Sequence, residues 1–155
     1  MTSFTVQALP ASALDRIRAL GVDDFGNSVE VTINQDAEGT PLRCCLRDAT
    51  VGERVALIAW RPFDRPGPYA EVGPVFIHAD RCEGYSDGND FPKGFRGRRQ
   101  IFRAYGPDGR CVHNRIIETD DAESSIAELL ARPGIEVVHS RNVLAGCYMF
   151  AIRRA

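Results

Sequence analysis

The chain has 155 residues, of which 44% are hydrophobic and 26% charged, and its formal net charge is -2 at pH 7. This length suits one hydrophobic core, so we expect residues 1–155 to form a single globular domain. The charge lacks the basic surplus that is typical of nucleic-acid-binding proteins, so we do not expect a nucleic-acid partner. No apolar run reaches the roughly 18 residues that a membrane span requires.

The N-terminal segment has neither the basic region nor the apolar core of a secretory signal, and the five cysteines are an odd number. Both features favour reduced thiols over a framework of disulfides. We therefore expect a cytoplasmic protein that makes no contact with a membrane. The sequence leaves the cofactors and the oligomeric state open, with a homodimer among the options.

The first third of the chain predicts a strand, a helix and a second strand. Residues 4–9 alternate between apolar and polar side chains. Apolar residues then follow at helical spacing, which predicts a helix over about residues 11–20 that Gly21 would end. Residues 29–33 alternate again, as in a strand with one solvated face.

The middle of the chain predicts a hairpin and a further buried strand. Residues 43–47 are short and apolar at their centre, and a turn at Gly52 separates them from residues 54–60. We interpret the two segments as a hairpin whose second arm is a central strand. Residues 72–78 read as another buried strand, and residues 80–97 form a loop long enough to be functional or mobile.

The last third predicts two more pairs of strands around a helix. Residues 99–105 and 110–117 flank a tight Pro-Gly turn and form a hairpin. A helix over about residues 120–132 begins with acidic side chains, which the helix dipole favours. Residues 135–139 and 147–152 then form strands that the turn at residues 140–146 joins.

These elements amount to about eight strands and two helices, with several hairpins and few alternating strand-helix units. Such an order predicts an α+β fold built on a mainly antiparallel sheet, rather than a doubly wound parallel sheet. The chain contains none of the common phosphate-binding, zinc-protease or nucleophile-elbow motifs.

His78 and Cys82 are four residues apart at the end of a predicted strand. That spacing could share a metal on a helix but has no special meaning in a strand, and the chain has no paired C-x₂-C doublets. Cys44 and Cys45 are neighbours, and in a strand their side chains would point to opposite faces, which makes a poor metal clamp. We expect these cysteines to serve mainly in packing.

Arginines flank the cysteine pair, and a guanidinium near a thiol lowers the pKa of that thiol. Arg43 therefore makes Cys45 a candidate nucleophile, because the two side chains would share one face. A second basic run, at residues 96–103, alternates between the faces of a strand and is interpreted as a solvated edge.

The densest polar segment is residues 139–148. His139 and Cys147 could form a thiolate–imidazolium pair if the turn brought them together. Arg141 and Asn142 could hold a carboxylate, a phosphate or an oxyanion. In the alternative interpretation, Asn142 satisfies backbone groups of the turn and Arg141 pairs with an acid such as Glu71.

Three segments, residues 43–48, 71–78 and 139–150, resemble an uncharacterised bacterial family of short proteins, catalogued as domain of unknown function 1203. The resemblance spans nearly the whole chain but implies no activity. It suggests that the three segments belong to one site.

The leading hypothesis is a domain that binds a small anionic molecule in a polar pocket at the strand ends. It assigns no metal, and whether the protein is an enzyme stays open. The ligand-binding residues of this pocket would be Arg43, Arg141, Asn142 and Tyr148. The candidates for proton transfer or nucleophilic attack would be His78, His139, Cys147 and Cys45.

Three alternatives remain. The first is a thiol-dependent enzyme that uses Cys147 or Cys45 with a histidine. The second is a metal site formed by four residues, His78, Cys82, His139 and Cys147. The third is an interaction module without chemistry, in which these side chains only stabilise the core.

Overall fold

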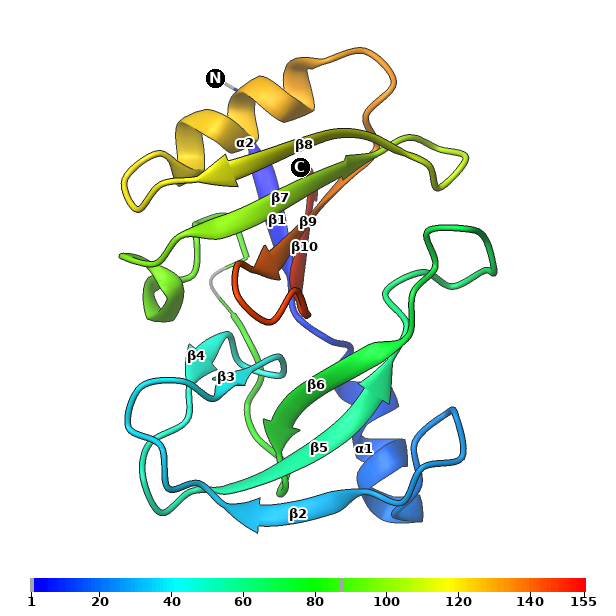
Figure 1. Ribbon diagram of the computed structural model, residues 1–155, viewed down its shortest axis with the longest axis vertical. Coiled ribbons are helices and arrows are strands. Elements are labelled where there is room, and N and C mark those ends of the chain that lie inside the picture. The colour runs from blue at the N-terminus through cyan, green and yellow to red at the C-terminus, as the bar shows by residue number, and fades with distance from the viewer. Residues whose placement is uncertain (1, 87) are drawn as a thin grey trace.

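The computed structural model describes residues 2–86 and 88–155. Within these residues, ten strands form two five-stranded sheets, with two α-helices and one short 3-10 helix. The sheets lie one above the other in Figure 1, each with one α-helix beside it. The predicted α+β class, with mainly antiparallel strands, is confirmed. The number of strands is larger than the predicted number of about eight. Two of the strands, β3 (Pro41–Leu42) and β4 (Arg47–Asp48), are only two residues long, which is too short for a hydrophobic period to reveal.

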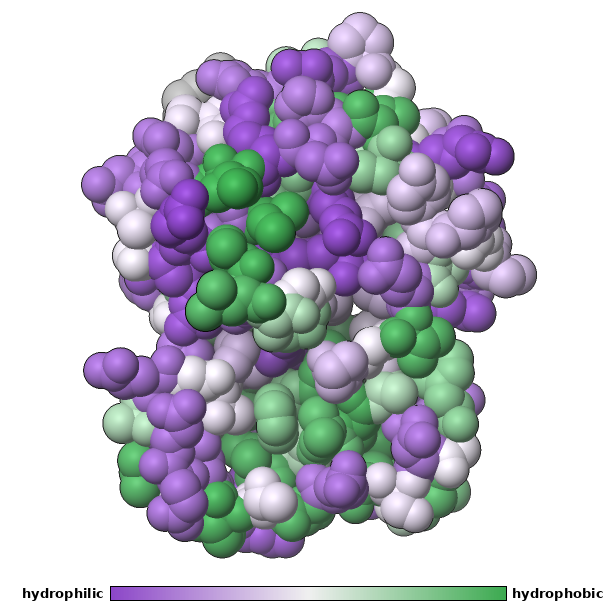
Figure 2. Space-filling model, in the orientation of Figure 1, coloured by the Kyte–Doolittle hydropathy of each residue, from purple (hydrophilic) through white to green (hydrophobic). Residues whose placement is uncertain are grey.

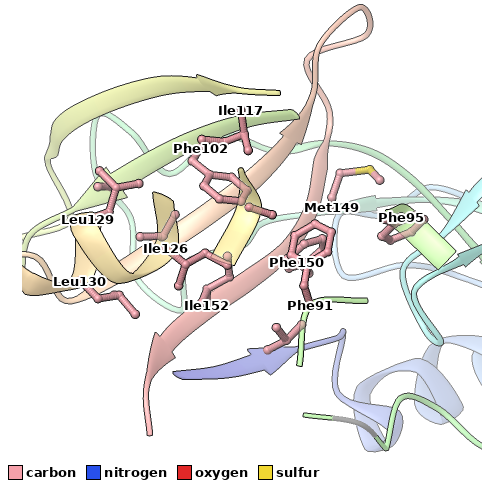
Figure 3. Packing of buried hydrophobic residues seen from close by; sticks show 14 of the residues in the cluster. Phe91, Phe95, Phe102, Ile117, Ile126, Leu129, Leu130, Met149, Phe150 and Ile152 are labelled. Atoms are coloured by element: carbon pink, nitrogen blue, oxygen red, sulfur yellow. The ribbon is translucent and has the colours of Figure 1, made fainter. Parts of the chain in front are cut away.

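The first sheet has the order β1-β10-β9-β7-β8, and all its neighbours are antiparallel. Helix α2 packs on one face, and Figure 3 shows its apolar side chains against those of the strands. The predicted hairpin of residues 99–105 and 110–117 is confirmed as β7 and β8. The elements are β1 (Phe4–Gln7), β10 (Tyr148–Arg154), β9 (Val137–Asn142), β7 (Gln100–Tyr105), β8 (Cys111–Ile117) and α2 (Ala122–Ala131).

The second sheet has the order β2-β5-β6-β3-β4, and only the β3–β6 pair is parallel. Helix α1 contributes Leu14 and Ile17 to its core. Figure 2 shows further apolar residues gathered over the area of β5 and β6. The elements are α1 (Ala11–Leu20), β2 (Glu30–Ile33), β3 (Pro41–Leu42), β4 (Arg47–Asp48), β5 (Arg54–Trp60) and β6 (Gly73–His78).

Both helices lie where the sequence predicts them. Helix α1 ends at Gly21, whose φ of 68° is left-handed and whose N–H donates to the carbonyl of Ile17 over 2.9 Å. Glycine adopts this conformation without steric cost, which explains why the helix stops there. None of the helices in the described part of the chain is long and apolar enough to cross a membrane.

The predicted hairpin of residues 43–47 with 54–60 is wrong. Residues 43–46 form a turn that joins β3 to β4, while β5 pairs with β2 and β6. Cys44 and Leu46 are both buried, but Cys44 belongs to the core of the second sheet and Leu46 to that of the first. The apolar centre of the segment therefore reflects a turn between two cores and not a strand.

The predicted turn at residues 140–146 is too long, because β9 continues to Asn142. Along β9, Val138 belongs to the core under α2, and Val137 to the core of the second sheet. Side chains alternate along a strand, so His139 and Arg141 share the face of Val137 and point toward the second sheet. The polar segment thus lies at the junction of the two sheets.

The long loop between β6 and β7 connects the two sheets and contains the 3-10 helix η1 (Lys93–Phe95). Its side chains Phe91 and Phe95 are buried in the core of the first sheet, beside Phe150 (Figure 3). These aromatic side chains therefore hold the loop against the first sheet.

Gly94 tests how tightly this loop packs on the turn between β3 and β4. A Cβ atom at Gly94 would lie 2.8 Å from both the Cα atom of Arg47 and the carbonyl oxygen of Leu46. Because backbone must then shift, we expect Gly94→Ala to lower the free energy of unfolding by about 1–3 kcal/mol. Gly67→Ala is the control, since a Cβ atom there meets nothing within 4 Å. Equal urea midpoints for the two variants would contradict this packing.

Candidate metal centre

Four potential metal ligands converge at one edge of the second sheet. The Sγ atoms of three cysteines and one imidazole nitrogen all lie within 4.8 Å of one another. Two cysteines come from the turn between β3 and β4, the histidine ends β6, and the third cysteine opens the long loop. The four residues are Cys44, Cys45, His78 and Cys82.

The turn explains why neighbouring cysteines can share this site. Cys44 and Cys45 lie outside a strand, and their Sγ atoms are 3.9 Å apart. The expectation that their side chains point to opposite faces is therefore wrong, because it assumed strand geometry. Leu46, which follows them, has a left-handed φ of 57°, and its side chain is anchored in the first core. Such strain in a residue other than glycine often marks a functional position.

The distances among Cys44, Cys45 and His78 match those of a tetrahedral site. Sulfur atoms that are each about 2.3 Å from a tetrahedral zinc lie roughly 3.8 Å apart, and sulfur and nitrogen ligands lie roughly 3.6 Å apart. The Cys44–Cys45 Sγ separation is 3.9 Å. The Nδ1 atom of His78 lies 3.4 Å from the Sγ of Cys44 and 3.6 Å from the Sγ of Cys45.

The other nitrogen of His78 faces a carboxylate. Its Nε2 atom lies 3.1 Å from Oε1 of Glu53, which Arg47 holds by two contacts of 2.6 and 2.9 Å. The Arg47 guanidinium holds the pKa of Glu53 well below its usual range. When Nε2–H donates to this carboxylate, the lone pair of Nδ1 points at the thiols, as in carboxylate–histidine–metal triads. In the other tautomer, Nε2 accepts from Arg47, whose Nη2 is 3.2 Å away.

The thiols differ in acidity. The contact with Cys45 and its own burial raise the pKa of Cys44, whereas the hydrogen bond from Cys44 lowers the pKa of Cys45. Burial raises the pKa of Cys82. The backbone N–H of His78 donates to the Sγ atom of Cys44 over 3.2 Å, which favours negative charge on that sulfur.

The predicted ligand-binding arginines are buried and bonded to the chain. Arg43 is 1% exposed, and it donates from Nε to the carbonyl of Tyr148 and from Nη1 to that of Pro41. Its Nη2 atom lies 2.9 Å from the Sγ of Cys147. Arg141 is 5% exposed, donates to the carbonyl of Gly146, and lies 3.4 Å from Glu71.

Asn142 and Cys147 hold the turn between β9 and β10. The Oδ1 atom of Asn142 accepts hydrogen bonds from the backbone N–H groups of Leu144 and Ala145. The backbone N–H of Asn142 donates to the carbonyl of Cys147. The structure therefore brings Cys147 to Arg43 and not to His139. These contacts correspond to the alternative interpretation, in which the polar residues satisfy the turn.

His139 lies among aromatic rings at the junction of the sheets. Its ring centroid is 4.8 to 5.1 Å from those of Tyr105, Phe63 and Tyr148. The side chain is almost fully buried, and its Nδ1 atom has no hydrogen-bond partner among the described residues. Burial and the nearby charge of Arg141 lower the pKa of His139 to about 3, so the imidazole is neutral at pH 7.

The structure thus divides the predicted residues into two sets. Cys45 and His78 lie in the candidate metal centre, with Cys44 and Cys82. The remaining candidates lie at the junction of the sheets: Arg43, His139, Arg141, Asn142, Cys147 and Tyr148. Glu53 is not among the predicted residues, because the sequence marks it only as an acidic residue just before a buried strand.

The basic run of residues 96–103 is matched by acidic partners. Arg96 pairs with Glu123 and Arg98 with Asp48. Arg99 lies 3.0 Å from an oxygen of Glu118. The interpretation of the run as a strand edge is wrong, because β7 pairs with β8 on one side and with β9 on the other; the ion pairs instead satisfy these charges.

The comparison with protein families adds an assignment without an activity. The family described as Protein of unknown function (DUF1203) matches residues 39–154, and the chain belongs to this family. All four residues of the candidate metal centre and Glu53 lie within the matched range. No curated protein and no solved structure matches the chain.

The buried imidazole predicts a loss of stability at mildly acidic pH. The pKa of His139 is about 3 in the folded state, below the ordinary 6.5, so protons bind the unfolded state first. Its contribution to stability is complete above pH 6.5 and is lost as the pH falls toward 3. We expect the free energy of unfolding to fall by about 2 kcal/mol between pH 7 and pH 5 because of this residue.

Urea unfolding at both pH values measures this loss. His139→Phe removes the titrating ring from its aromatic surroundings, so its stability should depend less on pH than that of the wild type. His113→Phe, in the edge strand β8, should keep the wild-type dependence. The same pH dependence in all three proteins would show that His139 does not titrate in this way.

Proposed function

We propose that the protein binds a divalent transition metal, most suitably zinc, through Cys44, Cys45, Cys82 and Nδ1 of His78. The observation that carries the proposal is the approach of four ligand atoms to within 4.8 Å of one another. Three of the ligand separations, 3.4 to 3.9 Å among Cys44, Cys45 and His78, already equal those around a tetrahedral metal within a few tenths of an ångström, and the Sγ atom of Cys82 lies within 4.8 Å of the other ligand atoms.

The donor set favours zinc over harder cations. Three thiolates and one imidazole are soft or borderline ligands, which suit zinc or iron, whereas magnesium and calcium require oxygen ligands. Because the thiols must lose their protons, metal binding releases protons and weakens at low pH.

Four protein ligands fill a tetrahedral coordination sphere and leave no position open for water or substrate. This supports a structural metal and not a catalytic one. The metal would join the turn between β3 and β4 to the end of β6 and to the first residues of the long loop. The metal would thus act as a cross-link between these segments.

The earlier hypotheses have less support at this site. Anion binding by Arg43 and Arg141 competes with the hydrogen bonds that both guanidinium groups already make to the chain. A thiol-dependent enzyme that uses Cys147 lacks the contact with His139. Of the earlier metal set, only His78 and Cys82 lie in the cluster.

Metal titration of the reduced protein tests the proposal. We expect one Co²⁺ per chain, with the intense visible absorption of tetrahedral thiolate coordination, and its displacement by Zn²⁺. At 100 times its dissociation constant, zinc should stabilise the fold by about 2.7 kcal/mol. Peptide mapping after iodoacetamide should show that zinc protects the three ligand cysteines.

Matched cysteine variants give the control. Cys82→Ser and His78→Ala should each lose stoichiometric binding. Cys111→Ser should bind as the wild type does, because its Sγ atom contacts the Oδ1 of Asn114, outside the cluster. If the reduced wild type binds neither metal, or if Cys82→Ser binds both unchanged, the proposal is wrong.

Glu53→Gln tests the role of the carboxylate behind His78. The amide keeps the size of the side chain but removes the charge that orients Nε2–H, so we expect zinc affinity to fall about 10- to 100-fold. Competition with a chromophoric chelator measures the affinity. Glu118→Gln, which breaks a surface pair with Arg99, should leave the affinity unchanged. Equal affinities of the two variants would remove Glu53 from the centre.

A further inference from the structure

A cavity of about 590 Å³ lies where the two sheets meet, separate from the cysteine cluster. Its walls come from the segment between β1 and α1, from the segment after β5, and from the faces of β9 and β10 that point away from α2. Pockets of this volume are typical of small-molecule sites. Aromatic side chains line much of it, namely Phe25, Trp60, Phe63 and Tyr148.

His139 lines the same cavity, and one of its ring nitrogens is an unsatisfied buried polar atom. Its side chain is 2% exposed, and Nδ1 has no hydrogen-bond partner among residues 2–86 and 88–155. A buried polar atom without a partner costs about 1–3 kcal/mol, so such an atom beside a cavity calls for an explanation. A bound ligand with a hydrogen-bonding group supplies one.

The charges around the cavity select the sign of that ligand. Arg61 and Arg153 line it, and the charges of Arg141, Arg153 and Arg103 all disfavour a proton on His139. Of the charged residues that line the cavity, Asp24 pairs with Arg16 at 2.8 Å and Arg153 with Glu136 at 3.2 Å, and Asp64 is exposed to solvent. These charges favour an anionic group over a cationic one.

We propose that this cavity binds a small aromatic carboxylate, with its ring against Trp60 and Phe63 and a carboxylate oxygen accepting a hydrogen bond from the imidazole of His139. Aromatic rings at 4.5 to 7 Å between centroids attract one another, and the cavity offers several such faces. Arg61 lines the cavity, and its Nε donates a hydrogen bond to the carbonyl of Phe63 over 2.9 Å. The Nη atoms of its guanidinium would bind the anion. The site does not depend on the metal centre.

Trp60 provides the assay, because it is the one tryptophan in the chain and it lines the cavity. In a ¹⁵N-labelled sample, its indole N–H gives a single, resolved signal. Three probes of similar size separate shape from charge: benzoate, benzyl alcohol and benzylamine. We expect benzoate to shift the indole signal saturably, benzyl alcohol to bind at least several-fold more weakly, and benzylamine to give no saturable shift.

Two variants and their controls place the probe. His139→Phe should weaken benzoate at least tenfold, whereas His113→Phe, outside the cavity lining, should bind as the wild type does. Arg61→Gln lies nearer the surface and gives a second test if the first variant does not fold. It should weaken benzoate several-fold, with Arg110→Gln as its exposed control.

Each contrary outcome overturns the proposal. No saturable shift with any of the three probes would remove the site. Equal binding of benzylamine and benzoate would remove the selection for an anion. Unchanged benzoate binding by both His139→Phe and Arg61→Gln would place the probe elsewhere.

Discussion

The buried guanidinium of Arg43 holds the two sheets together. It donates to the carbonyls of Pro41 and Tyr148 and lies against the sulfur of Cys147, while its backbone N–H donates to the carbonyl of Phe76. One residue thus links β3 and β6 of the second sheet to β10 of the first. An arginine keeps its charge even when burial lowers its pKa, so the charge must be satisfied by the chain around it. Removal of a partner from such a buried charge is strongly destabilising.

This constraint positions both sites. The residue after Arg43 is Cys44, so the guanidinium that reaches into the first sheet also fixes the start of the cysteine-bearing turn. On the other side, the carbonyl that accepts from Arg43 belongs to Tyr148, whose ring lines the cavity beside His139. The cluster and the cavity are chemically different, yet one buried side chain orders the backbone of each.

Local patterns predicted the helices and most of the long strands, because each depends on a period or a stop signal within a few residues. Helix α1 ends at Gly21 for the reason that the sequence indicates, and β7 and β8 pair across the expected turn. The sequence could not predict the second sheet as a separate layer, because hydrophobic period does not say which strands share a core. Leu46 and Cys44 look like one apolar segment, although they are buried in different cores.

The candidate site was predicted only in its parts. His78 and Cys82 were singled out together, but the strand assumed for Cys44 and Cys45 hid their convergence. The two residues lie in a turn and not in a strand, and the left-handed φ of Leu46 within that turn is signalled by no residue type in the segment. Glu53 contacts His78 across 25 positions of sequence, and such a contact exists only once β5 and β6 have paired.

The turn between β3 and β4 has a consequence for how the molecule opens. Side chains of this turn pack in the cores of both sheets. Disorder in one core would therefore disturb the turn, and through it the other core. The two sheets should therefore exchange their most protected amide protons in one cooperative step, as a single foldon and not as two. A metal bound at this turn would slow that common opening. It would therefore protect amides of the first sheet as well, although the strands of that sheet carry none of the ligands.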